Sequence, residues 1–269
     1  MVRSHAKTSK ATIERSEALP AKRAQVALRL TIVEPPERWR LEEEDVPETP
    51  LHDAIIQTLL LVLKEWVRQQ GRSALVTSNL ACRWDPADAR VGTDPDVVLV
   101  EPAPPEGEHL SSLRIWEPGH AAPRVAVEVV DEGTANKDYL DAPTRCARLG
   151  VRELWVFDPL LAGPSDAGGP YLLQVWRRSG DLSGALERVH AGVAPACSEE
   201  LGAYLVVTEN GRRLRLATDP GGQTLWPTAE ESALLRMEEQ RARAEEQRTR
   251  AEAAEAELTR VRMLLPEGK

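Results

Sequence analysis

The chain has 269 residues, of which 42% are hydrophobic and 29% charged, so it can bury a sizeable core and is not disordered throughout. It contains neither a run of about 18 apolar residues nor the apolar stretch of a signal peptide near its start, so we expect a cytoplasmic protein without membrane spans. Its three cysteines, Cys82, Cys146 and Cys197, have no zinc-site spacing and predict no disulfide framework.

The net charge of −9 argues against a protein that coats nucleic acid, and this charge is unevenly distributed. Residues 1–40 carry +5 and residues 230–269 carry −2, which leaves −12 for residues 41–229. If this middle part contacts DNA, a local basic patch or a bound metal must offset its acidic charge.

In chain order, residues 1–45 are predicted to form a polar, partly disordered arm, which could touch nucleic acid but is more typical of a solvated tail. A helix follows Pro50 and ends at Gly71. Within it, apolar residues recur at the spacing of one buried helical face: Ile55, Ile56, Leu59, Leu60, Leu63, Trp66 and Val67.

The pattern then changes to strands and one further helix. That helix is predicted to start at Pro143, after a cap at Asp141 or Ala142, and to end at Gly150. Because it joins two hydrophobic strands over 22 residues, the unit is expected to be a right-handed parallel crossover in an α/β domain over residues 46–228. The predicted strands are Ala74–Leu80, Asp96–Val100, Ser111–Trp116, Arg124–Val130, Glu153–Phe157, Tyr171–Arg177 and a hairpin of Tyr204–Thr208 with Arg212–Leu216.

Residues 229–269 are predicted to form a long polar helix or weak coiled coil, since 229–265 lack glycine and proline. Residues with small or apolar side chains recur every seven positions, and the matching second core positions of the heptad are polar. Two interpretations stay open: a solvated helix held by Glu/Arg pairs four residues apart, or a coil that self-associates or binds a protein partner. The apolar series is Met237, Ala244, Ala251, Leu258 and Leu265, and the polar series is Arg241, Arg248, Glu255 and Arg262.

Two acidic residues stand in hydrophobic strands, and they suggest a metal site. A charge such as Glu128 within Val-Ala-Val-Glu-Val-Val is costly to bury unless it is paired or binds a metal. Asp96 begins its own hydrophobic strand, and if the two strands pair, both carboxylates can reach one point. Two carboxylates, a backbone carbonyl and water suit Mg²⁺ or Mn²⁺, which can activate water and neutralise charge on a phosphodiester.

Structural explanations for the same residues remain open. Asp96 could cap a turn after Pro95, and Glu128 could face solvent on a one-sided sheet. His52 at a helix start is more often a cap or a polar packing residue, and Asp158 is interpreted mainly as a turn or hydrogen-bonding residue. Three tryptophans are expected in the core: Trp66, Trp155 and Trp176.

Residues 94–100 (Asp-Pro-Asp-Val-Val-Leu-Val), the strand 125–130, Gly133-Thr134, Asp138 and residues 150–159 (Gly-Val-Arg-Glu-Leu-Trp-Val-Phe-Asp-Pro) resemble the Uma-two putative restriction endonuclease family. The resemblance covers roughly residues 45–220 and includes the Leu51-His52 start of the first helix. It places the chain in the PD-(D/E)XK nuclease superfamily. That implies a central mixed sheet flanked by helices.

By position, the resemblance implies that Asp96 and Glu128 bind the metal, Mg²⁺ or Mn²⁺, and that Asp138 is the acid after the turn that follows the Glu128 strand. The family often has a lysine four residues after that acid, where this chain has Ala142. The other superfamily position, two residues after Glu128, is occupied by Val130. Lys137 is one of only six lysines and is the nearby substitute.

Two functions follow from these residues. The first is a metal-dependent endonuclease that hydrolyses phosphodiester bonds, with DNA as its substrate and with Asp96, Glu128, Lys137 and Asp138 in the active site. The second is a catalytically inactive nuclease fold that acts as an assembly or regulatory module through its C-terminal helix. The empty lysine positions and the long polar helix motivate the second.

Overall fold

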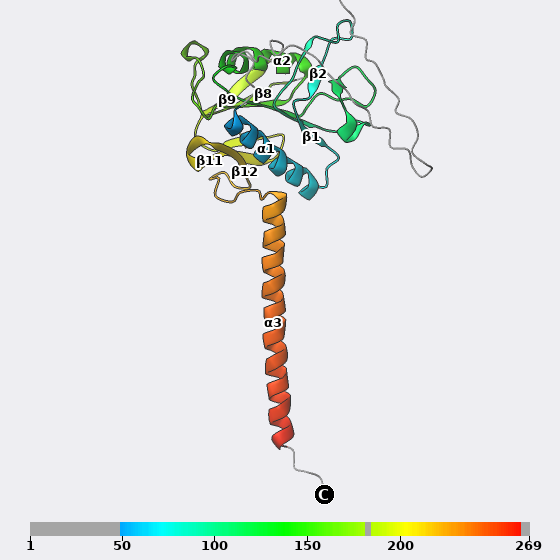
Figure 1. The fold of residues 1–269 in the computed structure, drawn as a ribbon, viewed down its shortest axis with the longest axis vertical. Coiled ribbons are helices and arrows are strands. Elements are labelled where there is room, and N and C mark those ends of the chain that lie inside the picture. The colour runs from blue at the N-terminus through cyan, green and yellow to red at the C-terminus, as the bar shows by residue number, and fades with distance from the viewer. Residues whose placement is uncertain (1–48, 181–183, 265–269) are drawn as a thin grey trace, which may run out of the picture. The chain divides into compact units, whose positions relative to one another are not determined.

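The computed structural model describes residues 49–180 and 184–264, so the predicted arm at 1–45 lies outside the described residues. Its centre is a six-stranded sheet with the order β1-β4-β6-β7-β8-β9. Figure 1 labels β1, β8 and β9 of this sheet. Strands β6 and β7 are parallel and all other neighbours are antiparallel, which confirms the predicted crossover and the mixed sheet. The strands are β1 Leu75–Ser78, β4 Val97–Val100, β6 Val125–Val129, β7 Glu153–Phe157, β8 Leu173–Arg178 and β9 Leu186–Gly192.

Two three-stranded sheets accompany the central one. The first has the order β10-β11-β12 and contains the predicted hairpin as β11 and β12. The second has the order β3-β2-β5, with β2 parallel to β5. Their strands are β10 Ala196–Ser198, β11 Ala203–Thr208, β12 Arg213–Ala217, β2 Ala81–Arg83, β3 Gly92–Thr93 and β5 Ser112–Arg114.

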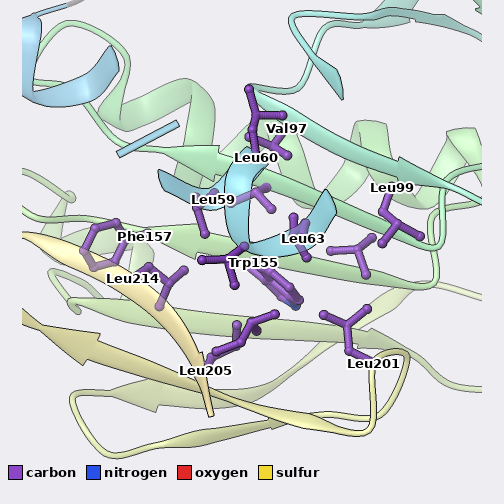
Figure 2. Close-up of a cluster of buried hydrophobic side chains, with 14 of the residues drawn as sticks. Leu59, Leu60, Leu63, Val97, Leu99, Trp155, Phe157, Leu201, Leu205 and Leu214 are labelled. Atoms are coloured by element: carbon purple, nitrogen blue, oxygen red, sulfur yellow. The ribbon is translucent and has the colours of Figure 1, made fainter. Parts of the chain in front are cut away.

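Helix α1, Pro50–Gln69, forms as the hydrophobic spacing predicts. The Thr49 side chain accepts a hydrogen bond from the backbone N–H of His52 at 3.3 Å, and Pro50 occupies the first helical position, where its missing N–H costs nothing. The apolar face of α1 is buried between the central sheet and the β10-β11-β12 sheet. Figure 2 shows Leu59 and Leu63 of α1 above Trp155 of β7, with Leu205 of β11 beyond.

The other face of the central sheet packs against α2, Ala142–Leu149, and the β3-β2-β5 sheet. Alternate residues of β6 divide between the faces: Val125, Val127 and Val129 point toward α1, and Ala126 toward α2. Trp66 and Trp155 are buried in the α1-side core, as predicted, whereas Trp176 is only partly buried, against the α2-side core.

The helix after β6 differs from the prediction, because helical backbone begins well before Pro143. A π-helical turn, Lys137–Asp141, leads directly into α2, and the N–H of Ala142 donates to the carbonyl of Lys137, five residues earlier. Pro143 has no N–H to place, so it is tolerated directly after this wide turn. The predicted end is confirmed, since Gly150 adopts a left-handed φ of 93°.

Helix α3, Ala229–Leu264, confirms the predicted C-terminal helix. Thr228 and Glu231 form a capping box, with N–H to side-chain distances of 2.7 and 3.2 Å, and Arg215 of β12 pairs with Glu231 at 2.8 Å. Ser232 is buried against α1, and residues 233–261 are exposed. Within 49–180 and 184–264, no helix is long and apolar enough to cross a membrane.

Candidate metal site at the ends of β4 and β6

The two predicted metal ligands lie on neighbouring antiparallel strands. Val97 of β4 is paired with Val127 of β6, and the next pair in this register is Asp96 with Glu128. Directly opposite residues of an antiparallel pair point to the same face, with their Cβ atoms roughly 5 Å apart. The sheet therefore brings the two acids close to each other, as pairing of these strands was expected to do.

Glu128 is completely buried, so the alternative in which it faces solvent is wrong. Neither of its carboxylate oxygens has a hydrogen-bond partner of normal geometry within the described residues. Burial, and then the charge of Asp96, raise the pKa of Glu128 well above its usual value; the charge of Lys137 and the backbone N–H of Asp96 oppose this only in part. An uncompensated buried carboxylate is expensive, and such groups concentrate at functional sites.

Asp96 is held by the backbone of β6 and by α1. Its Oδ2 accepts a hydrogen bond from the N–H of Val129 at 2.6 Å and lies 3.4 Å from Nε2 of His52. That same nitrogen is 2.9 Å from the carbonyl oxygen of Val129, and since a carbonyl can only accept, Nε2 carries a proton. His52 is therefore a buried polar packing residue, one of its predicted roles, and it joins α1 to both Asp96 and β6.

Asp138 and Lys137 approach the acid pair from the π-helical turn. Asp138 is buried and accepts a hydrogen bond from the hydroxyl of Thr134 at 2.6 Å, and the Lys137 ammonium lies 3.8 Å from its Oδ1. Burial raises the pKa of Asp138 to about 6, although Thr134 and Lys137 oppose that shift. Burial lowers the pKa of Lys137, but the charges of Glu128, Asp138 and Asp96 outweigh it and raise the pKa overall.

These donors fit a hard divalent cation. The carboxylates of Asp96 and Glu128 supply oxygen ligands, and Mg²⁺ is often held by one or two carboxylates while it keeps several waters. The unpartnered oxygens of Glu128 are the strongest sign that this site takes a ligand. Within the described part of the chain, no three His, Cys, Asp or Glu side chains are arranged to hold an ion by themselves.

The prediction for Asp158 as a hydrogen-bonding residue is confirmed. Its carboxylate accepts hydrogen bonds from the hydroxyl of Tyr139 at 2.8 Å and from the N–H groups of Ala162 and Gly163 at 3.0 and 2.9 Å. Sequence reasoning missed Tyr139 and Thr134. Thr134 is among the residues that carry the family resemblance, and its position four residues before Asp138 could also have identified it, because residues four apart on a helix are neighbours.

All three cysteines are free: Cys82 and Cys146 are buried and Cys197 is exposed. The lysine positions that the resemblance implies hold apolar side chains, and both Ala142 and Val130 are buried in the α2-side core. Of the expected site residues, Asp96, Glu128, Asp138 and Lys137 are thus close to one another, with Lys137 as the cation beside the acids.

Comparison with known proteins agrees with the family that the sequence resembles. The model of the Uma2 family, described as putative restriction endonuclease, matches residues 28–163, half of the chain. The protein therefore belongs to the Uma2 family, the Uma-two family of the sequence resemblance.

A solved structure, a putative nuclease belonging to DUF820 from Anabaena variabilis ATCC 29413, is similar at 18% identity with a TM-score of 0.38. The match covers 57% of this chain and 75% of that one. No curated protein matches the chain.

Proposed function

We propose that this protein is a metal-dependent endonuclease that hydrolyses phosphodiester bonds in DNA. The observation that carries the proposal is Glu128, a completely buried carboxylate with no hydrogen bond of normal geometry among the described residues, opposite Asp96 in the register of β4 and β6. Membership of the Uma2 putative restriction endonuclease family supports the reaction class.

Asp96 and Glu128 would hold Mg²⁺ or Mn²⁺. When bound, the cation supplies charge neutralisation and lowers the pKa of water. The residues of the chain prepare the site: the Val129 N–H and His52 orient the Asp96 carboxylate. The Lys137 ammonium adds positive charge next to the acids, where a scissile phosphate would develop negative charge.

Asp138 has a separate task in this proposal. With a pKa of about 6 it changes its protonation state near neutral pH, which suits a group that exchanges a proton during the reaction. Its bond from Thr134 fixes one oxygen, and the other oxygen faces the Lys137 ammonium. Asp138 thus assists by holding Lys137 and by buffering the proton balance of the site.

Plasmid cleavage in Mg²⁺ or Mn²⁺ tests the proposal. Wild-type protein should nick or linearise the plasmid, and both Asp96→Ala and Glu128→Ala should lose this activity to the background of the metal alone. Asp166→Asn, an exposed carboxylate on the turn Ser165–Ala167, is the matched control and should cut like the wild type. Equal cutting by all four proteins would mean that the activity belongs to a contaminant and that these acids are not the active site.

The alternative function is a nuclease fold without catalysis that assembles through α3. It is favoured by the apolar side chains exposed on α3, among them Leu234, Met237 and Leu258, and by the seven-residue spacing. Opposing it, intrahelical pairs such as Arg248–Glu252 and Arg250–Glu246 already satisfy charges on α3 without a partner.

Light scattering separates the two interpretations of α3. The full chain is compared with a chain of residues 1–236, which keeps Glu231 and Ser232 and therefore the attachment of the helix to the domain. A dimer that becomes a monomer on truncation supports assembly through α3. Two monomers support a solvated helix.

A further inference from the structure

Tyr139 lies in the π-helical turn between the predicted site and the loop after β7. Its hydroxyl donates to Oδ2 of Asp158 at 2.8 Å and accepts a hydrogen bond from the N–H of Tyr171 at 3.0 Å. Asp158 is completely buried, and its carboxylate also binds the N–H groups of Ala162 and Gly163. These five groups therefore form one connected polar cluster.

The ring of Tyr139 is closely packed against two glycines. A Cβ added at Gly163 would lie 2.1 Å from the Tyr139 ring, and one added at Gly169 would lie 2.6 Å from it. Real side chains do not approach so closely, so these two glycines leave the space that the ring fills. Packing and hydrogen bonds thus fix Tyr139 from several sides.

The π-helical turn has a geometric consequence for Lys137. In an α-helix the residues above position 137 would be 140 and 141. Here the N–H of Ala142 donates to the Lys137 carbonyl, so Ala142 lies over Lys137. Ala142 is the position where the family often has its lysine, and it faces the α2-side core toward which Glu128 also points. The wide turn therefore brings Lys137 to the same side of the helix as position 142, where the family often has its lysine.

We infer that Tyr139 and Asp158 are positioning residues for Lys137: their hydrogen bond holds the π-helical turn that presents the Lys137 ammonium to Asp138 and Glu128. This inference rests on the proposed nuclease function for its catalytic meaning. Asp158 directly follows β7, and β7 is the parallel neighbour of β6, which carries Glu128. The cluster thus connects the strand pair β6 and β7, which carries Glu128, to the turn that carries Lys137. Lys137 then takes the place of the family's lysine at position 142.

Plasmid cleavage by Tyr139→Phe, Lys137→Gln and the double variant tests this inference, with the chain kept at full length. Tyr139→Phe retains the ring that the glycines enclose and removes only the hydroxyl. It should lower kcat by roughly 10- to 100-fold, because misplacing a catalytic group by about 1 Å costs that much. KM and Mn²⁺ affinity should stay within about twofold of wild type, because the metal ligands are untouched.

The double variant distinguishes positioning from a general structural role. If Tyr139 acts through Lys137, the double variant should cut as slowly as Lys137→Gln and no slower. Tyr204→Phe, in β11, is the matched control and should cut like wild type. A wild-type rate for Tyr139→Phe, or a loss in the double variant equal to the product of the single losses, would overturn the inference.

Failure of the nuclease proposal is recognised separately. If wild-type protein cuts no DNA with either metal, that proposal fails, and the positioning of Lys137 is then decided by acetylation of the six lysines, read by mass spectrometry. Lys137 in the wild type should react several-fold more slowly than the exposed Lys64, and Tyr139→Phe should bring the two rates together. An unchanged ratio in the variant would show that Tyr139 does not hold Lys137.

Discussion

Glu128 and Glu153 are two completely buried glutamates on adjacent parallel strands, β6 and β7, and they differ in what surrounds them. Glu153 accepts hydrogen bonds from the Trp155 indole at 2.7 Å and the Glu199 N–H at 3.1 Å, and it pairs with Arg177 at 3.4 Å. Glu128 has no hydrogen bond of normal geometry within the described residues and has Asp96 as a neighbour of like charge.

The electrostatics of the two carboxylates follow from this difference. Burial raises the pKa of Glu153, but hydrogen bonds from Ser198 and Trp155 and the charge of Arg177 oppose the shift. For Glu128, Asp96 adds to the effect of burial. Glu153 is thus a structural residue that joins the central sheet to the segment around β10, whereas the cost of burying Glu128 is offset only in part by Lys137 and the Asp96 N–H. The lack of hydrogen-bond partners, and not burial alone, therefore marks the candidate site.

The largest effect is expected from removing the satisfied carboxylate. Glu153→Ala leaves the Trp155 N–H, the Glu199 N–H and Arg177 without their acceptor, and breaking a buried pair in this way costs about 3–5 kcal/mol. Urea unfolding should show this loss in the free energy of unfolding. Ser179→Ala, whose hydroxyl lies 3.0 Å from exposed Glu187, is a suitable control and should change little. An unchanged free energy of unfolding in Glu153→Ala would mean that the hydrogen-bond partners of Glu153 do not set it apart from Glu128.

The next prediction concerns metal binding by the unsatisfied carboxylate. Glu128→Gln should weaken Mn²⁺ binding by at least about 100-fold, because even partners of metal ligands cost 10- to 100-fold when lost. Titration calorimetry measures this affinity directly, without a need for DNA cleavage. Glu187→Gln, an exposed carboxylate of β9, serves as the control. Equal Mn²⁺ affinity in Glu128→Gln and wild type would remove the central evidence for the metal site.

The fold was largely predictable, because its main strands carry long hydrophobic patterns. β4, β6 and β7 and the crossover between β6 and β7 lie where the sequence indicated, and with them the approach of Asp96 to Glu128. The strands β2, β3, β9 and β10 were not predicted. β3 has only two residues, and β9 exposes most of its side chains, so neither carries a clear alternation.

The finer parts of the candidate site could not be predicted, since they depend on contacts without a local pattern. A single π-helical turn leaves no periodicity in the sequence. Pro143 predicted a helix start six residues after Lys137, so Lys137 was not expected to be helical. The Tyr139–Asp158 hydrogen bond joins residues 19 positions apart across a loop. Only the folded chain shows that Lys137 and Asp138 face Glu128 in place of a lysine at 142.

A smaller effect is expected in the dependence of stability on pH. The pKa of Asp138 is raised to about 6, so protonation favours the folded state, and this contribution is lost as pH rises through 6. With metal chelated, Asp138→Asn should therefore gain stability relative to wild type between pH 4 and pH 7, by at most about 3 kcal/mol for a shift of two pKa units. Thermal unfolding across that range measures the difference in stability between the two proteins. A difference that does not change with pH would contradict the raised pKa of Asp138.

Glu65 provides a third buried glutamate and the smallest predicted effect. Its carboxylate accepts hydrogen bonds from Arg68, Gln69 and Ser232, and these bonds, with Arg68 first, lower its pKa to about 2 against the opposing effect of burial. Because two other partners remain, Ser232→Ala should cost only about 1 kcal/mol in the free energy of unfolding.

The same substitution tests how α3 is attached to α1. Ser232 provides the buried contact between the two helices, so its loss should raise hydrogen exchange at the start of α3 while exchange in β6 and β7 stays unchanged. Thr249→Ala, whose hydroxyl bonds within the exposed part of α3 at 3.0 Å, is the matched control. If Ser232→Ala lowered the free energy of unfolding as much as Glu153→Ala, a buried carboxylate would not tolerate the loss of even one hydrogen-bond partner. That result would contradict the prediction for Glu65.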